Sequence, residues 1–140
     1  MQGVHPLQAS PDFAEAAFSF LDGLGFKVDD RLVTAGNTSR DGWRLSYSSL
    51  AMKVVVQYLD SQFEILFIRG ETTASYLFLD RYLFDRRSGL HGDMFSPQEL
   101  APVVNRIAND IRDHYRSILS DDTEEWERIG RLLNVPLPKR

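Results

Sequence analysis

Two histidines and two aspartates are the residues of this sequence best suited to acid–base or metal chemistry. Asp110 and His114 lie four residues apart in "NDIRDH", so on a helix both side chains would project from one face. His91 and Asp93 occur in "SGLHGDM", and a histidine can transfer protons near neutral pH. Together the four residues form a candidate polar site for a small hydrolase or a ligand-binding protein.

Simpler interpretations account for the same residues. Asp110 and His114 have the spacing of a solvated ion pair on a helix, whereas zinc sites usually need three or four protein ligands. His91 and Asp93 stand among glycines, as they would in a turn. The chain has no cysteine, no G-x-S-x-G elbow, no P-loop and no G-x-G-x-x-G. We therefore predict no catalytic residues, no cofactor and no bound metal, and we favour a protein that is not an enzyme.

The longest run of like charge contains Asp121, Asp122, Glu124, Glu125 and Glu127. Acidic residues stabilise the first turn of a helix because they oppose the positive end of its dipole, and this alone can explain their position. An acidic patch can also attract a basic protein and speed its association. These residues are the first candidate surface for a protein partner.

The composition limits the classes of function to be considered. The 140 residues include 16 Lys and Arg against 20 Asp and Glu, and the resulting net charge of −4 does not favour binding to nucleic acid phosphates. No apolar run has the length of a membrane-spanning helix, and the first residues lack the pattern of a secretory signal. The lack of cysteine suits a reducing compartment. We expect a cytoplasmic protein with neither nucleic acid nor membrane as a partner.

The spacing of apolar residues predicts the elements that position these side chains. Ser10-Pro11-Asp12 is a typical helix start, with Pro11 in the first helical position. The apolar stripe that follows runs to Leu24, and Gly25 can end the helix in a left-handed conformation. Residues 26–34 form a weak strand that charged residues interrupt, so we place it at a sheet edge.

A second candidate surface lies on the next strand. Its apolar residues alternate with Arg44, Ser46 and Ser48, so these three are predicted to face water or a partner. Residues 52–59 and 63–68 flank a short polar turn and favour a hairpin at the sheet centre, with the first strand covered on both faces for part of its length. Four apolar residues of this hairpin should lie in the core: Val54, Val56, Ile65 and Phe67.

The second half of the chain is predicted to be mostly helical. Residues 71–90 favour a short strand that passes into a short helix. A capping box at Ser96 opens the longest helix, which should reach about Leu119, and Ser120, Asp121 or Asp122 caps a final helix. We predict a single α+β domain over residues 1–140, with flexible ends at 1–9 and 135–140. Its antiparallel sheet of three to five strands receives the N-terminal helix and two C-terminal helices.

The whole chain resembles small, uncharacterised bacterial α+β proteins, some of which are immunity partners of polymorphic toxins. The segments that carry the resemblance are "FSFLDGLGF", "VVVQYLDSQFEILFIRG" and "ILSDDTEEWERI". The resemblance implies a non-enzymatic protein-interaction module that neutralises a toxin by binding, and the acidic run would suit a basic toxin domain. The alternative remains a small hydrolase or ligand-binding protein that uses the four-residue polar site. Whether the chain also forms a homodimer stays open.

Overall fold

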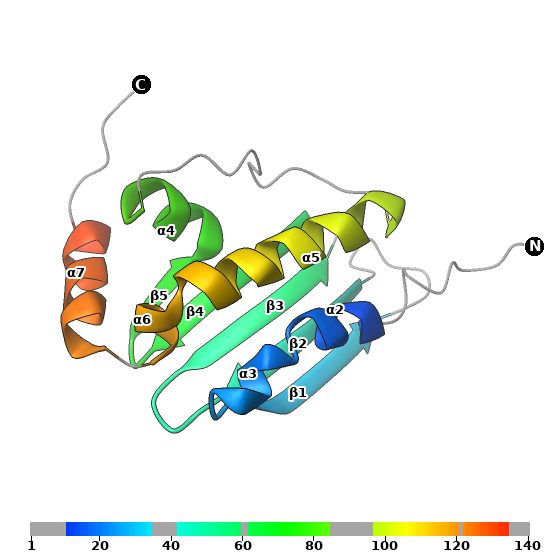
Figure 1. Cartoon of the computed structure of the whole chain (residues 1–140), viewed down its shortest axis with the longest axis horizontal. Helices are drawn as coiled ribbons and strands as arrows, with labels where there is room; N and C mark the ends of the chain where they lie inside the picture. The colour runs from blue at the N-terminus through cyan, green and yellow to red at the C-terminus, as the bar shows by residue number, and fades with distance from the viewer. Residues whose placement is uncertain (1–10, 35–41, 60–61, 85–96, 121, 135–140) are drawn as a thin grey trace, which may run out of the picture.

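A five-stranded antiparallel sheet is the centre of the fold, which is described from a computed structural model that covers residues 11–34, 42–59, 62–84, 97–120 and 122–134. Each strand pairs with the next one along the chain, in the order β1-β2-β3-β4-β5 (Figure 1). The strands are β1 (Lys27–Thr34), β2 (Gly42–Ser48), β3 (Lys53–Leu59), β4 (Gln62–Arg69) and β5 (Thr72–Ser75). The predicted α+β class with an antiparallel sheet is confirmed.

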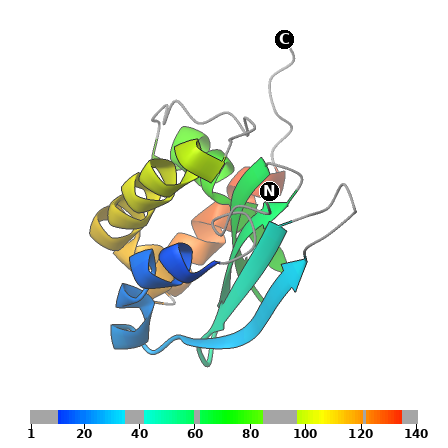
Figure 2. The same ribbon diagram turned by 90° about the vertical axis from the view of Figure 1, so that its right-hand side faces the viewer.

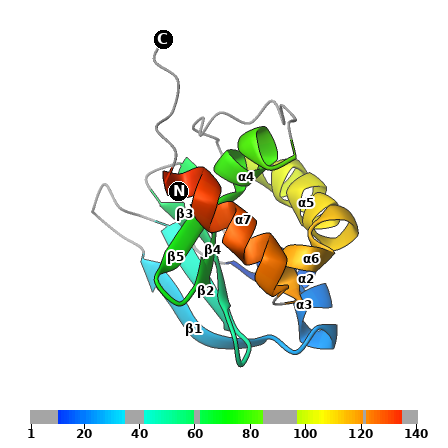
Figure 3. The ribbon, with the colours of Figure 1, turned by 90° about the vertical axis from the view of Figure 1, so that its left-hand side faces the viewer.

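The helices form a layer on one face of this sheet. Helices α2, α3, α5 and α6 lie against that face, and α7 packs along β5 at the sheet edge (Figures 2 and 3). Helix α4 continues directly from β5. The helices are α2 (Asp12–Ala17), α3 (Phe20–Gly23), α4 (Tyr76–Tyr82), α5 (Pro97–His114), α6 (Arg116–Leu119) and α7 (Thr123–Asn134).

The first helix is shorter than its apolar stripe predicted. The segment divides into α2 and α3, and the backbone between them makes i→i−3 hydrogen bonds, such as that from Leu21 N–H to the Phe18 carbonyl. This tighter turn buries Phe18 and Leu21 completely. The predicted start is also wrong by one position, because Pro11 occupies the N-cap and the helix begins at Asp12. Gly25, with φ +92°, follows α3 as predicted.

The sheet register separates the two faces of each strand. Strand β1 is at an edge and β3 is at the centre, as predicted. Gly42 at the start of β2 has φ +150°, and a Cβ there would lie 1.8 Å from the Tyr58 carbonyl oxygen of β3. Only glycine therefore allows this close approach of the two strands. All four apolar residues that we assigned to the core of the β3–β4 hairpin are buried, which confirms that prediction: Val54, Val56, Ile65 and Phe67.

Strand β3 is buried on both faces over part of its length, as predicted, since Val54, Val55 and Val56 are all buried. No helix of the described residues lies on the sheet face opposite the helical layer (Figure 2). Val55 on that face is nevertheless only 8% exposed. Its direct neighbours in the register are Ser46 of β2 and Leu66 of β4, so adjacent side chains of the same face cover it.

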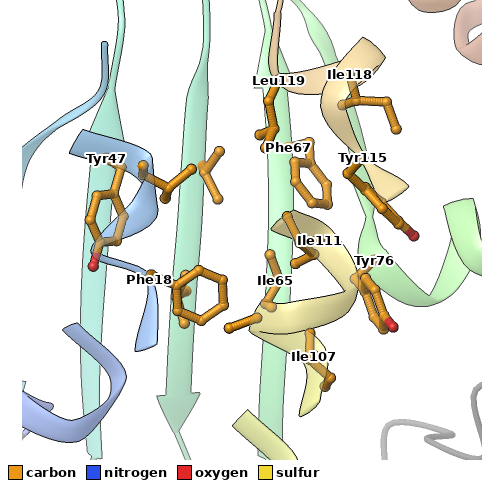
Figure 4. Close-up of a cluster of buried hydrophobic side chains, with 14 of the residues drawn as sticks. Phe18, Tyr47, Ile65, Phe67, Tyr76, Ile107, Ile111, Tyr115, Ile118 and Leu119 are labelled. Atoms are coloured by element: carbon orange, nitrogen blue, oxygen red, sulfur yellow. The ribbon is translucent and has the colours of Figure 1, made fainter. Parts of the chain in front are cut away.

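An aromatic cluster ends α5 earlier than the predicted Leu119. Tyr115 is fully buried and leaves the helical conformation, with φ −109° and ψ 22°, and α6 follows it. Its ring stacks on Phe67 and Tyr76 at centroid distances of 5.5 and 5.6 Å, and Phe84 lies 4.8 Å away. Figure 4 shows Tyr115 between β4 and α4, beside the isoleucines of α5 and α6. The transition from strand to helix predicted within residues 71–90 is confirmed as β5 and α4.

Candidate functional site

The second candidate surface, on β2, lies on the sheet face away from the helices. Arg44, Ser46 and Ser48 alternate in the register with Trp43, Leu45 and Tyr47, which are buried under the helices. Arg44 and Ser48 are partly exposed, whereas Ser46 is only 6% exposed. A partner on this face would therefore contact the two outer residues and reach little of Ser46.

The charges of this face are paired within the chain. Arg44 Nη2 lies 3.6 Å from Asp30 Oδ2, and Gln57 Nε2 donates to Glu64 Oε1 at 3.0 Å. The Ser48 hydroxyl donates to Asp29, and Lys53 Nζ lies 3.6 Å from the same carboxylate. These exposed contacts cross from strand to strand, and such pairs contribute little to stability individually. They leave the face with small net charge.

The acidic run at α7 divides into residues that stabilise the fold and residues that do not. Asp122 caps the helix, because its Oδ1 accepts from Glu125 N–H at 3.1 Å. Glu125 is partly buried, accepts from the Ser117 hydroxyl at 3.0 Å and lies 3.6 Å from Arg128 Nη1. Glu124 and Glu127 are exposed, and within the described part of the chain neither has a cation at ion-pair distance. Asp121 lies outside the described residues.

Asp110 and His114 form a three-residue array with Tyr76. A solvated ion pair would have both side chains exposed, and this pair does not. The Tyr76 hydroxyl donates to Asp110 Oδ2 at 2.7 Å, and His114 Nε2 lies 4.0 Å from Asp110 Oδ1. The His114 side chain is 60% exposed, but that of Asp110 is only 18% exposed. The contact with Tyr76 spans 34 residues in sequence, so helix periodicity alone had no means of indicating it.

Asp110 and His114 are the two residues of the predicted polar site that the structure describes. His91 and Asp93 lie outside the described residues. Within the ranges that the structure does describe, no group of three or more His, Cys, Asp or Glu side chains is arranged to hold a metal ion. The array can orient an imidazole through a carboxylate, but Tyr76 already uses one carboxylate oxygen.

Two ionisable groups of the described residues, Tyr47 and Asp113, have shifted pKa values. Burial raises the pKa of the Tyr47 phenol above its usual range, and the carboxylates of Glu15 and Asp22 raise it further. The hydroxyl is buried and has no hydrogen-bond partner among the described residues. The hydrogen bond from Arg112 lowers the pKa of the exposed Asp113. Neither shift creates a base or nucleophile poised near neutral pH.

The apolar residues that the structure exposes were not singled out by the sequence. Leu50, in the turn between β2 and β3, is fully exposed, and Ser49 orders this turn through hydrogen bonds with Ala51 and Met52. Val28, Leu32 and Val33 are 36–40% exposed along β1. The sequence signal that could have indicated the exposure of Leu50 is its position among small residues, after two serines and before an alanine. The exposure of β1 depends on which strands lie beside it.

The fold and these surfaces define a class of protein: an α+β domain whose sheet is layered with helices on one face. Among the described residues, no helix is long and apolar enough to cross a membrane. Comparison of the chain with protein-family models, with curated proteins and with solved structures found no match.

Proposed function

We propose that this chain is a non-enzymatic, cytoplasmic protein-interaction module of the immunity type, which neutralises a basic toxin domain by binding it. The observation that supports this proposal is the division of the acidic run at α7. Asp122 and Glu125 are engaged in the fold, whereas Glu124 and Glu127 are exposed and have no described counter-charge. Carboxylates of this second kind are available to a basic partner.

The position of the two glutamates favours association as well as contact. Glu124 and Glu127 are three residues apart on a helix, so they project from neighbouring positions of one surface. Helix α7 is held in place by Trp126, which is buried and donates from its indole N–H to the Ile118 carbonyl at 3.0 Å. Charges on a fixed helix keep their direction while a partner approaches, and a complementary field then raises the association rate.

The face at Arg44, Ser46 and Ser48 has a smaller part in this proposal. Arg44 and Ser48 already contact Asp30 and Asp29 within the chain, so a partner would have to replace those contacts. The face therefore contributes shape and hydrogen bonds to an interface more readily than it contributes charge.

The alternative function, a small hydrolase or a ligand-binding protein, has the Tyr76–Asp110–His114 array in its favour. The array supplies an exposed imidazole beside a partly buried carboxylate. A hydrolase also needs a group that stabilises the developing charge and a site that holds the substrate. We rank the binding function first, because the free carboxylates of α7 require no further group.

The test begins with co-expression of the chain and the products of the neighbouring genes, followed by purification of any complex. Association rates are then measured at low and at high salt for the wild type and for the double variant Glu124→Gln/Glu127→Gln. The matched control is Asp22→Asn/Asp113→Asn, which removes the same charge from exposed positions of α3 and α5. We expect slower association only for the α7 variant, and mainly at low salt.

Two results would contradict the proposal. Equal association rates for the wild type and the α7 variant at both salt concentrations would remove these carboxylates from the interface. A complex that is abolished by His114→Ala, but is unaffected by either charge variant, would favour the alternative function. Urea unfolding of each variant must show an unchanged fold, which we expect because both glutamates are exposed.

A further inference from the structure

Exposed apolar side chains of the described chain gather at one edge of the sheet. Five large apolar residues have an exposed fraction of 36% or more. Three of them, Val28, Leu32 and Val33, belong to β1, and the other two are Leu50 and Leu133. Leu50 stands in the turn that follows Ser48, and Ser48 is paired with Lys27, the first residue of β1. Scattered apolar residues need no explanation, but a concentration on one edge indicates contact.

The two edges of the sheet differ in their surroundings. Helix α7 packs along β5, and Arg69 at the end of the neighbouring β4 donates from Nη2 to Thr123 Oγ1 of α7 at 3.4 Å. On the opposite side, β1 is the last strand of the sheet, and no described strand or helix lies beyond it (Figures 1 and 3). Every residue of Lys27–Val33 is exposed. The backbone groups of β1 that point away from β2 are available for another strand.

Three charged residues of β1, Asp29, Asp30 and Arg31, do not require a charged partner, because each is paired within the chain. Arg31 faces the helical layer and joins β1 to α2, whereas Asp29 and Asp30 face the open side of the sheet. The pairs are Asp29 with Lys53 at 3.6 Å, Asp30 with Arg44 at 3.6 Å, and Arg31 with Glu15 at 3.3 Å and with Asp12. A strand added beside β1 would therefore meet a neutral edge.

The first half of β1 has features that protect an edge, and the second half lacks them. A bulge lies between Val28 and Asp30, and charged residues occupy Lys27 and 29–31. Bulges and charges are the usual means by which edge strands avoid pairing. From Leu32 to Thr34 the register is regular and no residue is charged. Leu32 projects on the open face, opposite Arg44, and Val33 on the helical face, opposite Trp43.

We propose that residues 30–34 of β1 accept an extended, uncharged segment of the partner protein as a sixth strand of the sheet. This proposal rests on the proposed function, because it assumes that the chain acts by contact with another protein. The added backbone would bond to the outward groups of β1, and its side chains would cover Leu32 on one face and Val33 on the other. The partner segment should therefore carry apolar or β-branched residues at consecutive positions.

A second copy of this chain is a less suitable occupant. Two identical antiparallel strands pair about a two-fold axis, so one residue must lie opposite its own copy. An axis at Asp30 or at Arg31 would oppose like charges, which destabilises the pair. An axis at Leu32 avoids this, but it places Arg31 of one copy opposite Val33 of the other, so only Leu32 would meet an apolar side chain. A foreign strand has no such restriction on its register.

The experiment uses the full chain and a displayed library of random peptides of about ten residues, enough to pair with the whole edge. Selected peptides are titrated against the wild type, against Leu32→Lys/Val33→Lys, and against the control Leu133→Lys on α7. Both altered positions of β1 are exposed, so the variant should fold, and circular dichroism checks this. The oligomeric state of each protein is measured by light scattering in the absence of peptide.

We expect uncharged, β-forming peptides whose affinity falls roughly tenfold or more for the β1 variant and is unchanged for the control. Peptides that are N-methylated on alternate residues should fail to bind, since main-chain hydrogen bonds carry the contact. Hydrogen exchange should slow at alternate amides of residues 30–34, because the others already bond to β2.

Three results would overturn the proposal. Selection could return no binding peptide, or peptides that bind the β1 variant as tightly as the wild type. Alternatively, the wild type could be a dimer that the β1 variant converts to a monomer, which would assign the edge to a second copy. A failure of the charge variants of α7 to change toxin association would contradict the proposed function alone, since the peptide titrations do not involve that surface.

Discussion

Two tyrosine hydroxyls in this fold should have opposite effects on stability when each is removed by the same change. Tyr47 and Tyr76 are both buried. The Tyr76 hydroxyl donates to Asp110 Oδ2 at 2.7 Å, whereas the Tyr47 hydroxyl has no hydrogen-bond partner among the described residues. Substitution by phenylalanine deletes only the oxygen and preserves the ring. Tyr47→Phe and Tyr76→Phe are therefore matched controls for each other.

The expected magnitudes follow from what each hydroxyl loses on folding. A hydrogen bond to a charged group is worth about 1.5 to 3 kcal/mol, so Tyr76→Phe should lower the free energy of unfolding by that amount. A buried hydroxyl without a partner pays for desolvation and receives no bond in return, at a cost of about 1 to 3 kcal/mol. Tyr47→Phe should therefore leave the free energy of unfolding unchanged or raise it, by about 1 kcal/mol.

Urea unfolding followed by circular dichroism measures both values. The midpoint should fall for Tyr76→Phe and hold or rise for Tyr47→Phe, with the same dependence on urea for all three proteins. One hydrogen bond usually contributes about 1 kcal/mol to the free energy of unfolding. If Tyr47→Phe lowers the free energy of unfolding by about 1 kcal/mol or more, this hydroxyl must be hydrogen-bonded. That result would refute the reasoning.

The same pair of proteins tests the pKa of Tyr47 at alkaline pH. Burial, with Glu15 and Asp22, raises the pKa of this phenol in the folded chain, so the folded state keeps the proton after the unfolded state has lost it. The shift has no effect on stability below the unfolded pKa of about 10, and it lowers the stability of the folded chain as the pH rises from there toward the folded pKa. Above about pH 10, the wild type should lose about 1.4 kcal/mol per pH unit relative to Tyr47→Phe. A constant difference between the two proteins would contradict the shift.

Three further predictions concern the core, the cap of α7 and the polar array. Val56→Asp should unfold the domain, since a buried, unpaired carboxylate costs several kcal/mol and the free energy of unfolding of a domain is only about 5 to 15 kcal/mol. Thermal melting checks this. Asp122→Ala should cost about 1 kcal/mol in urea unfolding, because it removes the cap on Glu125 N–H. Calorimetric titration of the untagged chain with Zn²⁺, Mn²⁺ and Ni²⁺ should show no tight site. A stoichiometric site that His114→Ala abolishes would reverse the ranking of the two functions.

Local patterns in the sequence were sufficient to predict the order and type of most elements. The alternation of Trp43, Leu45 and Tyr47 with polar residues depends only on the pleat of a strand, so it predicted which side of β2 is buried. The interrupted apolar pattern of residues 26–34 likewise indicated an edge strand. Predictions of this kind hold because a side chain's face depends on the strand or helix that contains it.

The candidate surfaces were only partly predictable. The sequence identified Asp110 and His114 as a pair, but not Tyr76, whose hydroxyl is brought to Asp110 by the packing of α4 against α5. It grouped the acidic residues of α7, but it did not separate Glu125, which contacts Ser117, from Glu124 and Glu127, which have no cation at ion-pair distance among the described residues. In both cases the deciding contact joins residues that are distant in the chain or lie on different helices.

The sequence by itself determined the α+β class, the central position of β3 and the burial of the apolar residues of its hairpin, because hydrophobic periodicity and turn residues act locally. The tertiary structure alone decided where α5 ends, since Tyr115 leaves the helix to stack on Phe67 and Tyr76. It also decided that α7 covers one edge of the sheet and leaves β1 open at the other. Tertiary packing determines these features, because the free energy of burying a ring or covering an edge depends on neighbours that a local sequence pattern does not identify.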